Sequence, residues 1–168
     1  GGSLAHADSA AELPVIATAV GAMITASGPA GARTSAADDF FTGVLQTTLT
    51  DDELLTSATF PIPLRWGFAE LARRQGDFAL VLAAVAQFTT GWRVVVGGIE
   101  GTPRRCTEAA AAADAGAYAE AARLAGREVE ATDHLHATAT YQRGMATEMV
   151  RRAFSTATTR GEGCCGSS

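Results

Sequence analysis

The chain has 168 residues, of which 47% are hydrophobic, and 18 acidic against 13 basic residues give a net charge of −5. This length and composition suit one domain or two small subdomains with a buried core, and they exclude wholesale disorder. The acidic balance and the scattered arginines argue against a surface that follows a nucleic-acid backbone. The longest apolar run, residues 15–26, is too short to span a bilayer, and no signal peptide is recognised ahead of it.

Residues 9–21 are predicted to form a helix. Ser9 is suited to cap its N-terminus, and Glu12 follows three residues later, which is the spacing of a capping box. Pro14 then falls in the first turns of the helix, where its missing N–H matters least.

Short strands are predicted to follow this helix. Two of them, within residues 22–36, pair across residues 28–31, whose sequence Gly-Pro-Ala-Gly is typical of a hairpin connection. Residues 38–43 are expected to form a turn that carries two large aromatic side chains. A polar turn at residues 51–53 leads into a strand over residues 55–60.

Pro61 and Pro63 are expected to mark a joint between subdomains, because each proline removes a donor and restricts its neighbour. Residues 78–88 beyond the joint are almost wholly apolar, as in a strand that is buried on both faces. A buried helix is the rival interpretation of this run. Three extended segments are expected in all, at residues 67–73, 78–88 and 93–99, with a turn at residues 74–77.

The remainder of the chain is predicted to be helical, over residues 107–115, 117–124 and 135–158. One face of the longest helix is apolar except at Gln142. The sequence therefore predicts an α+β fold, in which a short half-sheet precedes a three-stranded antiparallel sheet with a helical bundle. The face of the longest helix carries Leu135, Ala139, Gln142, Met145, Met149 and Ala153.

The three cysteines do not form a disulfide framework or a metal site. Cys164 and Cys165 are adjacent in a Gly/Ser-rich tail, a spacing that does not suit two ligands of one metal. We interpret them as free thiols of a flexible tail rather than a redox pair, and their role stays open. Together with Cys106, this usage fits a reducing, cytoplasmic compartment.

The first residues, Gly1, Gly2 and Ser3, are candidates for a phosphate-binding loop. Glycines without a Cβ let a dinucleotide pyrophosphate approach backbone N–H groups closely, and a serine hydroxyl adds a donor. The same three residues, taken alone, are also typical of a cloning linker. The sequence that follows them decides between the two interpretations.

The run Gly-Gly-Ser-Leu-Ala-His-Ala-Asp at residues 1–8 resembles the second flavin-binding motif of the FAD-binding medium subunit of molybdenum hydroxylases. Aerobic carbon monoxide dehydrogenase typifies this family, which is related to the flavin domain of xanthine dehydrogenase. Ser9 stands where the family usually has proline. Further matches follow in family order, at residues 37–43, Thr47, Leu49, residues 52–55, 68–74, 76–79 and 97–99, Pro103, residues 133–137, Tyr141 and Arg143.

The resemblance implies roles for seven matching residues. Gly1, Gly2 and Ser3 would face the FAD pyrophosphate. His6 would lie near the phosphates or the ribose, and Glu12 would contact the nucleotide portion. Leu55 would pack against the cofactor, and Asp39, like Phe41, would lie on the adjoining wall. Related enzymes can carry a basic residue at the position of Ala69, so no charged contact is expected from there.

Each assignment has a structural alternative. Glu12 is equally well explained as the capping-box partner of Ser9, and His6 as a solvated imidazole. Phe40 and Phe41 are more typical of a core than of a cofactor wall, and Leu55 is most simply explained as a buried strand residue.

Two further clusters of polar residues are not assigned to catalysis. Asp133, His134 and His136 are suggestive of a metal site, but the two histidines point to different sides of a helix, and Asp133 is suited to cap it. Glu70 and Asp77 are not expected to form a catalytic carboxylate pair, because nothing in the sequence places them together.

The resemblance implies an oxidoreductase subunit in which FAD passes electrons to an external acceptor. Its expected partners are an iron–sulfur small subunit with 2Fe-2S clusters and a large subunit with a molybdopterin cofactor. Residues 1–62 would be the C-terminal part of a PCMH-type FAD-binding subdomain, residues 63–160 a flavoprotein C-terminal domain and residues 161–168 a tail. The substrate and the electron acceptor cannot be named from the sequence.

The family binds FAD with two glycine loops, and residues 1–168 contain one of them. We therefore expect an N-terminally truncated subunit, and we expect the chain by itself to bind FAD weakly or not at all. The alternative is a structural or docking fragment that no longer binds FAD.

Overall fold

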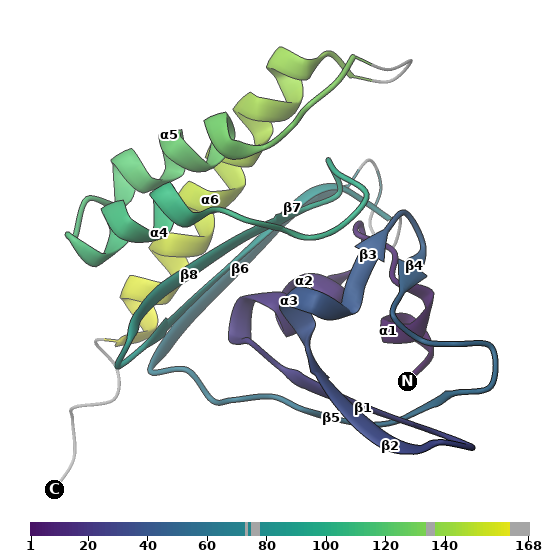
Figure 1. Ribbon diagram of the computed structural model, residues 1–168. Helices are drawn as coiled ribbons and strands as arrows, with labels where there is room; N and C mark the ends of the chain where they lie inside the picture. The colour runs from purple at the N-terminus through teal and green to yellow at the C-terminus, as the bar shows by residue number, and fades with distance from the viewer. Residues whose placement is uncertain (73, 75–77, 134–136, 162–168) are drawn as a thin grey trace, which may run out of the picture.

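The computed structural model describes residues 1–72, 74, 78–133 and 137–161, and it confirms an α+β fold built on antiparallel sheets (Figure 1). A three-stranded sheet and a four-stranded sheet lie on opposite sides of helix α2 (Glu12–Val20). Three further helices cover the far face of the larger sheet. The N-terminal helix α1 lies with the smaller sheet.

The smaller sheet has the strand order β2-β1-β5, formed by β1 (Met23–Gly28), β2 (Gly31–Ala36) and β5 (Leu54–Thr59). The hairpin predicted from the Gly-Pro-Ala-Gly sequence is confirmed, since Gly28 pairs with Gly31. Both pairings are antiparallel, and the β1–β5 register shifts between Thr25 and Ala26.

Short elements cover one face of this sheet and bury its core. They are α1 (Gly2–His6), α3 (Ala37–Phe40), β3 (Phe41–Gly43) and β4 (Gln46–Thr47). The aromatic pair expected in a turn instead ends α3 and begins β3, and both rings are buried at a centroid distance of 5.3 Å. The core cluster consists of Leu4, Ala7, Ala17, Ala22, Ile24, Ala37, Phe40 and Phe41.

The predicted capping of α2 by Ser9 is wrong. The helix begins after Ala11, which makes no side-chain cap. Ser9 instead donates its hydroxyl hydrogen to the carbonyl of Glu100 at 2.6 Å, and its own carbonyl accepts from Gly98 N–H at 2.8 Å. A partner 91 residues away, brought near by packing, has replaced the local cap.

The larger sheet has the order β6-β7-β8-β9 and is antiparallel throughout. Its long strands, β6 (Arg65–Ala72), β7 (Ala79–Phe88) and β8 (Gly91–Gly97), confirm the three predicted extended segments. The two-residue strand β9 (Arg104–Arg105) adds a short fourth. The apolar run is a strand and not a helix, because α2 packs on one of its faces and α6 on the other.

Helices α4 (Thr107–Asp114), α5 (Tyr118–Glu128) and α6 (Ala139–Gly161) form a layer on one face of the larger sheet (Figure 1). Trp92 and Phe154 anchor this interface, with ring centroids 5.2 Å apart. On the opposite face, Val15 and Ala19 of α2 pack against Leu82 and Val95. Each element therefore buries an apolar stripe against the sheet.

Helix α6 begins at Ala139, four residues later than predicted. Asp133 accepts a hydrogen bond from the N–H of Ala139 at 2.6 Å, which supports its predicted capping role. The one polar residue on the apolar face, Gln142, is buried. Its amide nitrogen donates to the carbonyls of Thr132 at 2.7 Å and Ala137 at 3.3 Å, so its amide group is satisfied although it lies on an apolar face.

Several predictions lie outside the described residues. These concern Arg73, Gly76, Asp77, His134, Leu135, His136 and the tail with Cys164 and Cys165. Within the described residues, no helix is both long enough and apolar enough to cross a membrane.

Candidate functional site

The candidate flavin-phosphate residues lie at the start of α1, beside strand β5. A Cβ added to Gly1 would lie 3.8 Å from the carbonyl oxygen of Leu55, while one added to Gly2 would have no described atom within 4 Å. Gly1, Gly2 and Ser3 are all exposed. The structure thus brings Leu55 next to Gly1.

Residues 1–3 form the first turn of a helix and not a loop. Gly1 is the N-cap of this helix. The helix ends at His6, and its C-cap residue Ala7 is buried and left-handed at φ 56°. Leu4 and Ala7 hold α1 to the core.

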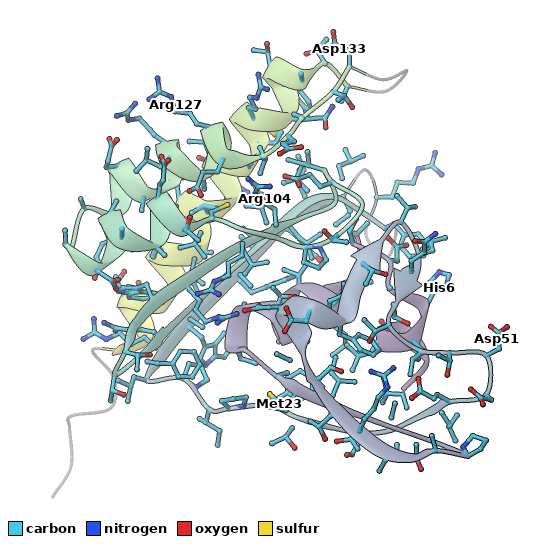
Figure 2. All side chains as sticks on the ribbon, viewed as in Figure 1. His6, Met23, Asp51, Arg104, Arg127 and Asp133 are labelled. Carbon is cyan, nitrogen blue, oxygen red and sulfur yellow. The ribbon has the colours of Figure 1, made fainter. Side chains whose placement is uncertain are left out.

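The remaining candidates are exposed on three elements. His6 ends α1 at the periphery of the molecule (Figure 2). Glu12 is the first residue of α2, and Asp39 lies in α3. No hydrogen bond joins His6, Glu12 or Asp39 to the glycines within the described part of the chain. Glu12 is not a capping-box partner, because Ser9 bonds elsewhere.

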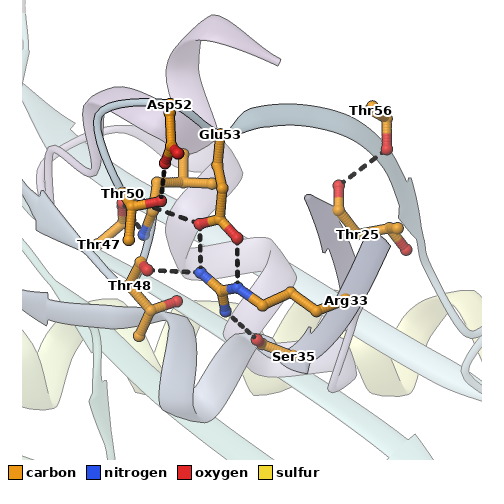
Figure 3. A network of polar contacts seen from close by, with 10 residues as sticks. Thr25, Arg33, Ser35, Thr47, Thr48, Thr50, Asp52, Glu53 and Thr56 are labelled. Carbon is orange, nitrogen blue, oxygen red and sulfur yellow. Dashed lines mark hydrogen bonds and ion pairs between the residues drawn. The ribbon is translucent and has the colours of Figure 1, made fainter. Parts of the chain in front are cut away.

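Arg33 of β2 and Glu53, the residue before β5, form a bidentate ion pair (Figure 3). The Nε–Oε1 distance is 2.6 Å, and the second guanidinium nitrogen lies 2.7 Å from Oε2. The same guanidinium donates to the carbonyl of Thr48 at 2.5 Å and to the hydroxyl of Ser35 at 3.2 Å. Thr50 N–H also donates to Glu53, at 2.9 Å.

This network lowers the pKa of Glu53 to about 2, chiefly through the hydrogen bond from Arg33 and next through that from the Thr50 backbone. The Glu53 side chain is 12% exposed and the Arg33 side chain 40%. Gly28 makes room for the acid, since a Cβ there would lie 3.0 Å from Cγ of Glu53. The carboxylate is therefore charged at neutral pH and held in one geometry.

A second polar network joins the larger sheet to helices α2 and α3. Arg93 of β8 donates to the carbonyl of Thr18 in α2 at 2.8 Å and to the carboxylate of Asp38 in α3 at 2.5 Å. Arg105 of β9 bonds the other oxygen of Asp38 at 3.0 Å. Asp38 is thus next to the candidate Asp39 in the chain, but its side chain links α3 to the larger sheet. We call this link the contact between the two halves of the molecule, the half with the smaller sheet and the half with the larger sheet.

An apolar cavity of about 350 Å³ lies between α2, the joint at residues 60–63 and strands β6 and β7. None of the predicted flavin-site residues lines it in the described part of the chain. It is lined by Ile16, Ala19, Val20, Phe60, Pro61, Ile62, Pro63, Trp66, Gly67, Phe68, Ala84, Val85 and Ala86.

The described residues contain no group of three or more His, Cys, Asp or Glu side chains placed to hold a metal ion. Asp133, the one described member of the suggested cluster, bonds the start of α6. The thiol of Cys106 is buried, and desolvation is the main cause that raises its pKa to about 12.

Sequence reasoning missed the two ion-pair networks formed by Arg33 with Glu53 and by Arg93 and Arg105 with Asp38. The ion-pair partners lie 20 to 67 residues apart in the chain, so no local spacing marks them. No signal in the sequence marks Arg33. The structure sets the strand register that places both Arg33 and Leu55 opposite Ala26, on the two strands that flank β1.

Two family models match the chain. The model for the FAD binding domain in molybdopterin dehydrogenase matches residues 1–63, and that for the CO dehydrogenase flavoprotein C-terminal domain matches residues 66–157. The chain therefore belongs to the family of FAD-binding medium subunits of molybdenum hydroxylases that includes CO dehydrogenase.

Individual relatives agree with this family. The nicotine 6-hydroxylase medium subunit of Paenarthrobacter nicotinovorans is 36% identical over 92% of this chain and 58% of its own length. The carbon monoxide dehydrogenase medium chain of Afipia carboxidovorans is 31% identical over 95% of this chain and 60% of its own. The chain thus spans somewhat more than half the length of these relatives.

Solved structures show the same fold. Quinoline 2-oxidoreductase from Pseudomonas putida 86 superposes with a TM-score of 0.87 at 32% identity, over 96% of this chain and 60% of that chain. Carbon monoxide dehydrogenase from Hydrogenophaga pseudoflava gives a TM-score of 0.85 at 31% identity, over 95% and 60%.

Proposed function

We propose that this chain supplies one wall of the FAD site in the medium subunit of a molybdenum hydroxylase. The match of residues 1–63 to the FAD-binding domain carries the proposal. The start of α1 agrees with it, because Gly1 and Gly2 carry no Cβ, and a pyrophosphate can approach backbone N–H groups closely where there is none.

The chain's own residues have defined tasks in this proposal. Gly1, Gly2 and Ser3 bind the pyrophosphate, and His6 and Glu12 contact the phosphate–ribose and nucleotide parts. Leu55 packs against the cofactor, and Asp39 lies on the adjoining wall. When bound, FAD supplies the one- and two-electron chemistry that the side chains lack. In this proposal, residues 1–62 are part of the FAD-binding subdomain, and residues 63–160 form the flavoprotein C-terminal domain.

The partners are part of the proposal. Electrons would arrive from 2Fe-2S clusters in a small subunit, after substrate oxidation at a molybdopterin cofactor in a large subunit, and would leave to an external acceptor. The family supports this assembly, because several relatives are named as medium chains or subunits of dehydrogenases. A cytoplasmic location belongs to the same proposal, and the free thiol of Cys106 agrees with it.

A titration with FAD tests this function. We expect the full-length polypeptide that carries residues 1–168 to quench flavin fluorescence stoichiometrically, and Ser3→Ala together with Gly2→Val to weaken binding. Residues 1–168 alone should bind weakly, because they contain one of the two glycine loops of the family. A full-length polypeptide without flavin affinity would refute the flavin role and favour a structural, docking role.

A further inference from the structure

Strand β4 and the residue Leu55 contact α1 from two sides. Strand β4 packs on α1, and the carbonyl of Leu55 lies against Gly1. The segment between them, residues 48–54, contains a turn at residues 51–52; Leu49 packs on the core, and Thr48 N–H donates to the carbonyl of Phe40 at 2.9 Å. The interactions that fix residues 48–54 therefore also fix the positions of β4 and Leu55 against the start of α1.

The Arg33–Glu53 ion pair holds that turn. Arg33 reaches Thr48 at its beginning and Glu53 at its end, and Glu53 accepts from Thr50 in its middle. Figure 3 shows the bonds to Thr48 and Glu53 meeting at the Arg33 guanidinium, and the bond from Thr50 ending on the Glu53 carboxylate. An ordinary exposed ion pair is worth little, but a bidentate pair inside a network is the exception.

The register places this pair on the face of the sheet that carries Leu55. Arg33, Ala26 and Leu55 stand in one row across β2, β1 and β5. Neighbours in a row of an antiparallel sheet share a face. Ala26 is buried and Leu55 packs on the core that holds α1, so the guanidinium lies at the edge of that core.

We infer that Arg33 and Glu53 are positioning residues of the flavin site: their ion pair holds the 48–54 turn so that Leu55 and β4 keep the start of α1 in its binding geometry. The inference rests on the proposed function. Neither side chain touches the cofactor. Both act through the backbone of the turn, and their loss loosens the site while the two sheets stay folded.

Two conservative variants test the pair in the full-length polypeptide. Arg33→Lys keeps the charge but loses the planar fork, and Glu53→Gln keeps the shape but loses the charge. Each should raise the Kd for FAD roughly tenfold, the size expected for a lost charge-assisted hydrogen bond. Hydrogen exchange in residues 48–55 should quicken in the same variants.

Arg151 and Glu148 of α6 provide a matched control. They form the same bidentate pair, with both distances 2.8 Å, far from α1. Arg151→Lys and Glu148→Gln should leave the Kd for FAD unchanged. Urea unfolding midpoints, measured for all four variants, show whether a change in FAD affinity is accompanied by a loss of stability.

The outcomes are distinct. The inference is supported if the Arg33 and Glu53 variants bind FAD more weakly than the Arg151 and Glu148 variants, while all four variants unfold at the same urea midpoint. FAD affinity equal to that of the controls overturns it, even if the midpoint falls. An unmutated polypeptide that binds no FAD overturns the proposed function itself.

Discussion

Single glycines decide how closely the helices approach the sheets. Gly67 of β6 is buried, and a Cβ there would lie 1.8 Å from the carbonyl oxygen of Ala153 in α6. At Gly144 on the same helix, a Cβ would have no described atom within 4 Å. One chemical change therefore has opposite consequences at two positions.

Gly67→Ala should destabilise the protein by about 3 kcal/mol or more, because the sheet and α6 must separate to admit the methyl group. Gly144→Ala should stabilise it by about 0.5–1 kcal/mol, because alanine favours the helix and meets no obstacle. Urea unfolding followed by circular dichroism measures both. Equal midpoints for the two variants would contradict the close approach of β6 and α6.

Asp38 joins helix α3 to two strands of the larger sheet, β8 and β9. The Arg93 side chain is 19% exposed and also bonds the Thr18 carbonyl, whereas the Arg105 side chain is 47% exposed. The less exposed arginine is less screened by solvent and is more firmly held. It should therefore contribute more to the contact between the two halves.

A pair of double-mutant cycles checks this ranking. Asp38→Asn combined with Arg93→Gln should give a coupling energy of about 1–3 kcal/mol, as for a partly buried charged hydrogen bond. Asp38→Asn combined with Arg105→Gln should give about 1 kcal/mol or less. The ranking fails if the coupling to Arg105 equals or exceeds the coupling to Arg93 in urea unfolding.

Among the described residues, two paired glutamates contribute to the acid sensitivity of the protein. The pKa values of Glu53 and Glu148 are both lowered to about 2, chiefly by hydrogen bonds from Arg33 and Arg151. Unfolding returns each pKa to 4.5, so the unfolded chain binds more protons between these values. The stabilisation is present above pH 4.5 and is lost as the pH falls toward 2.

A double variant isolates this effect. Glu53→Gln with Glu148→Gln should flatten the dependence of the unfolding free energy on pH between about 4.5 and 2 and leave its slope above pH 5 unchanged. Urea midpoints measured at half-unit pH steps give the slope. An identical acid slope in the variant and the unmutated protein would show that the two pairs are not kept in solution.

Most elements could be predicted because their signals are local. The apolar run of β7, the Gly-Pro-Ala-Gly hairpin and the acid before α6 all act within a few residues of one another. The start of α2 was predicted wrongly for the opposite reason, since Ser9 bonds a residue 91 positions away. The fourth strand, β9, has two residues and no periodicity to detect.

The candidate site divides in the same way. The order of its motifs along the chain indicated the family, and the resemblance to that family implied the seven flavin-site candidates. Only the glycines among them also follow from a physical argument, since they allow close backbone approach to a phosphate. Only the tertiary structure decided that Leu55 lies against Gly1, that residues 1–3 open a helix and that Arg33 and Glu53 meet. Strand register and packing bring such partners together, and neither can be predicted from the spacing of residues along the chain.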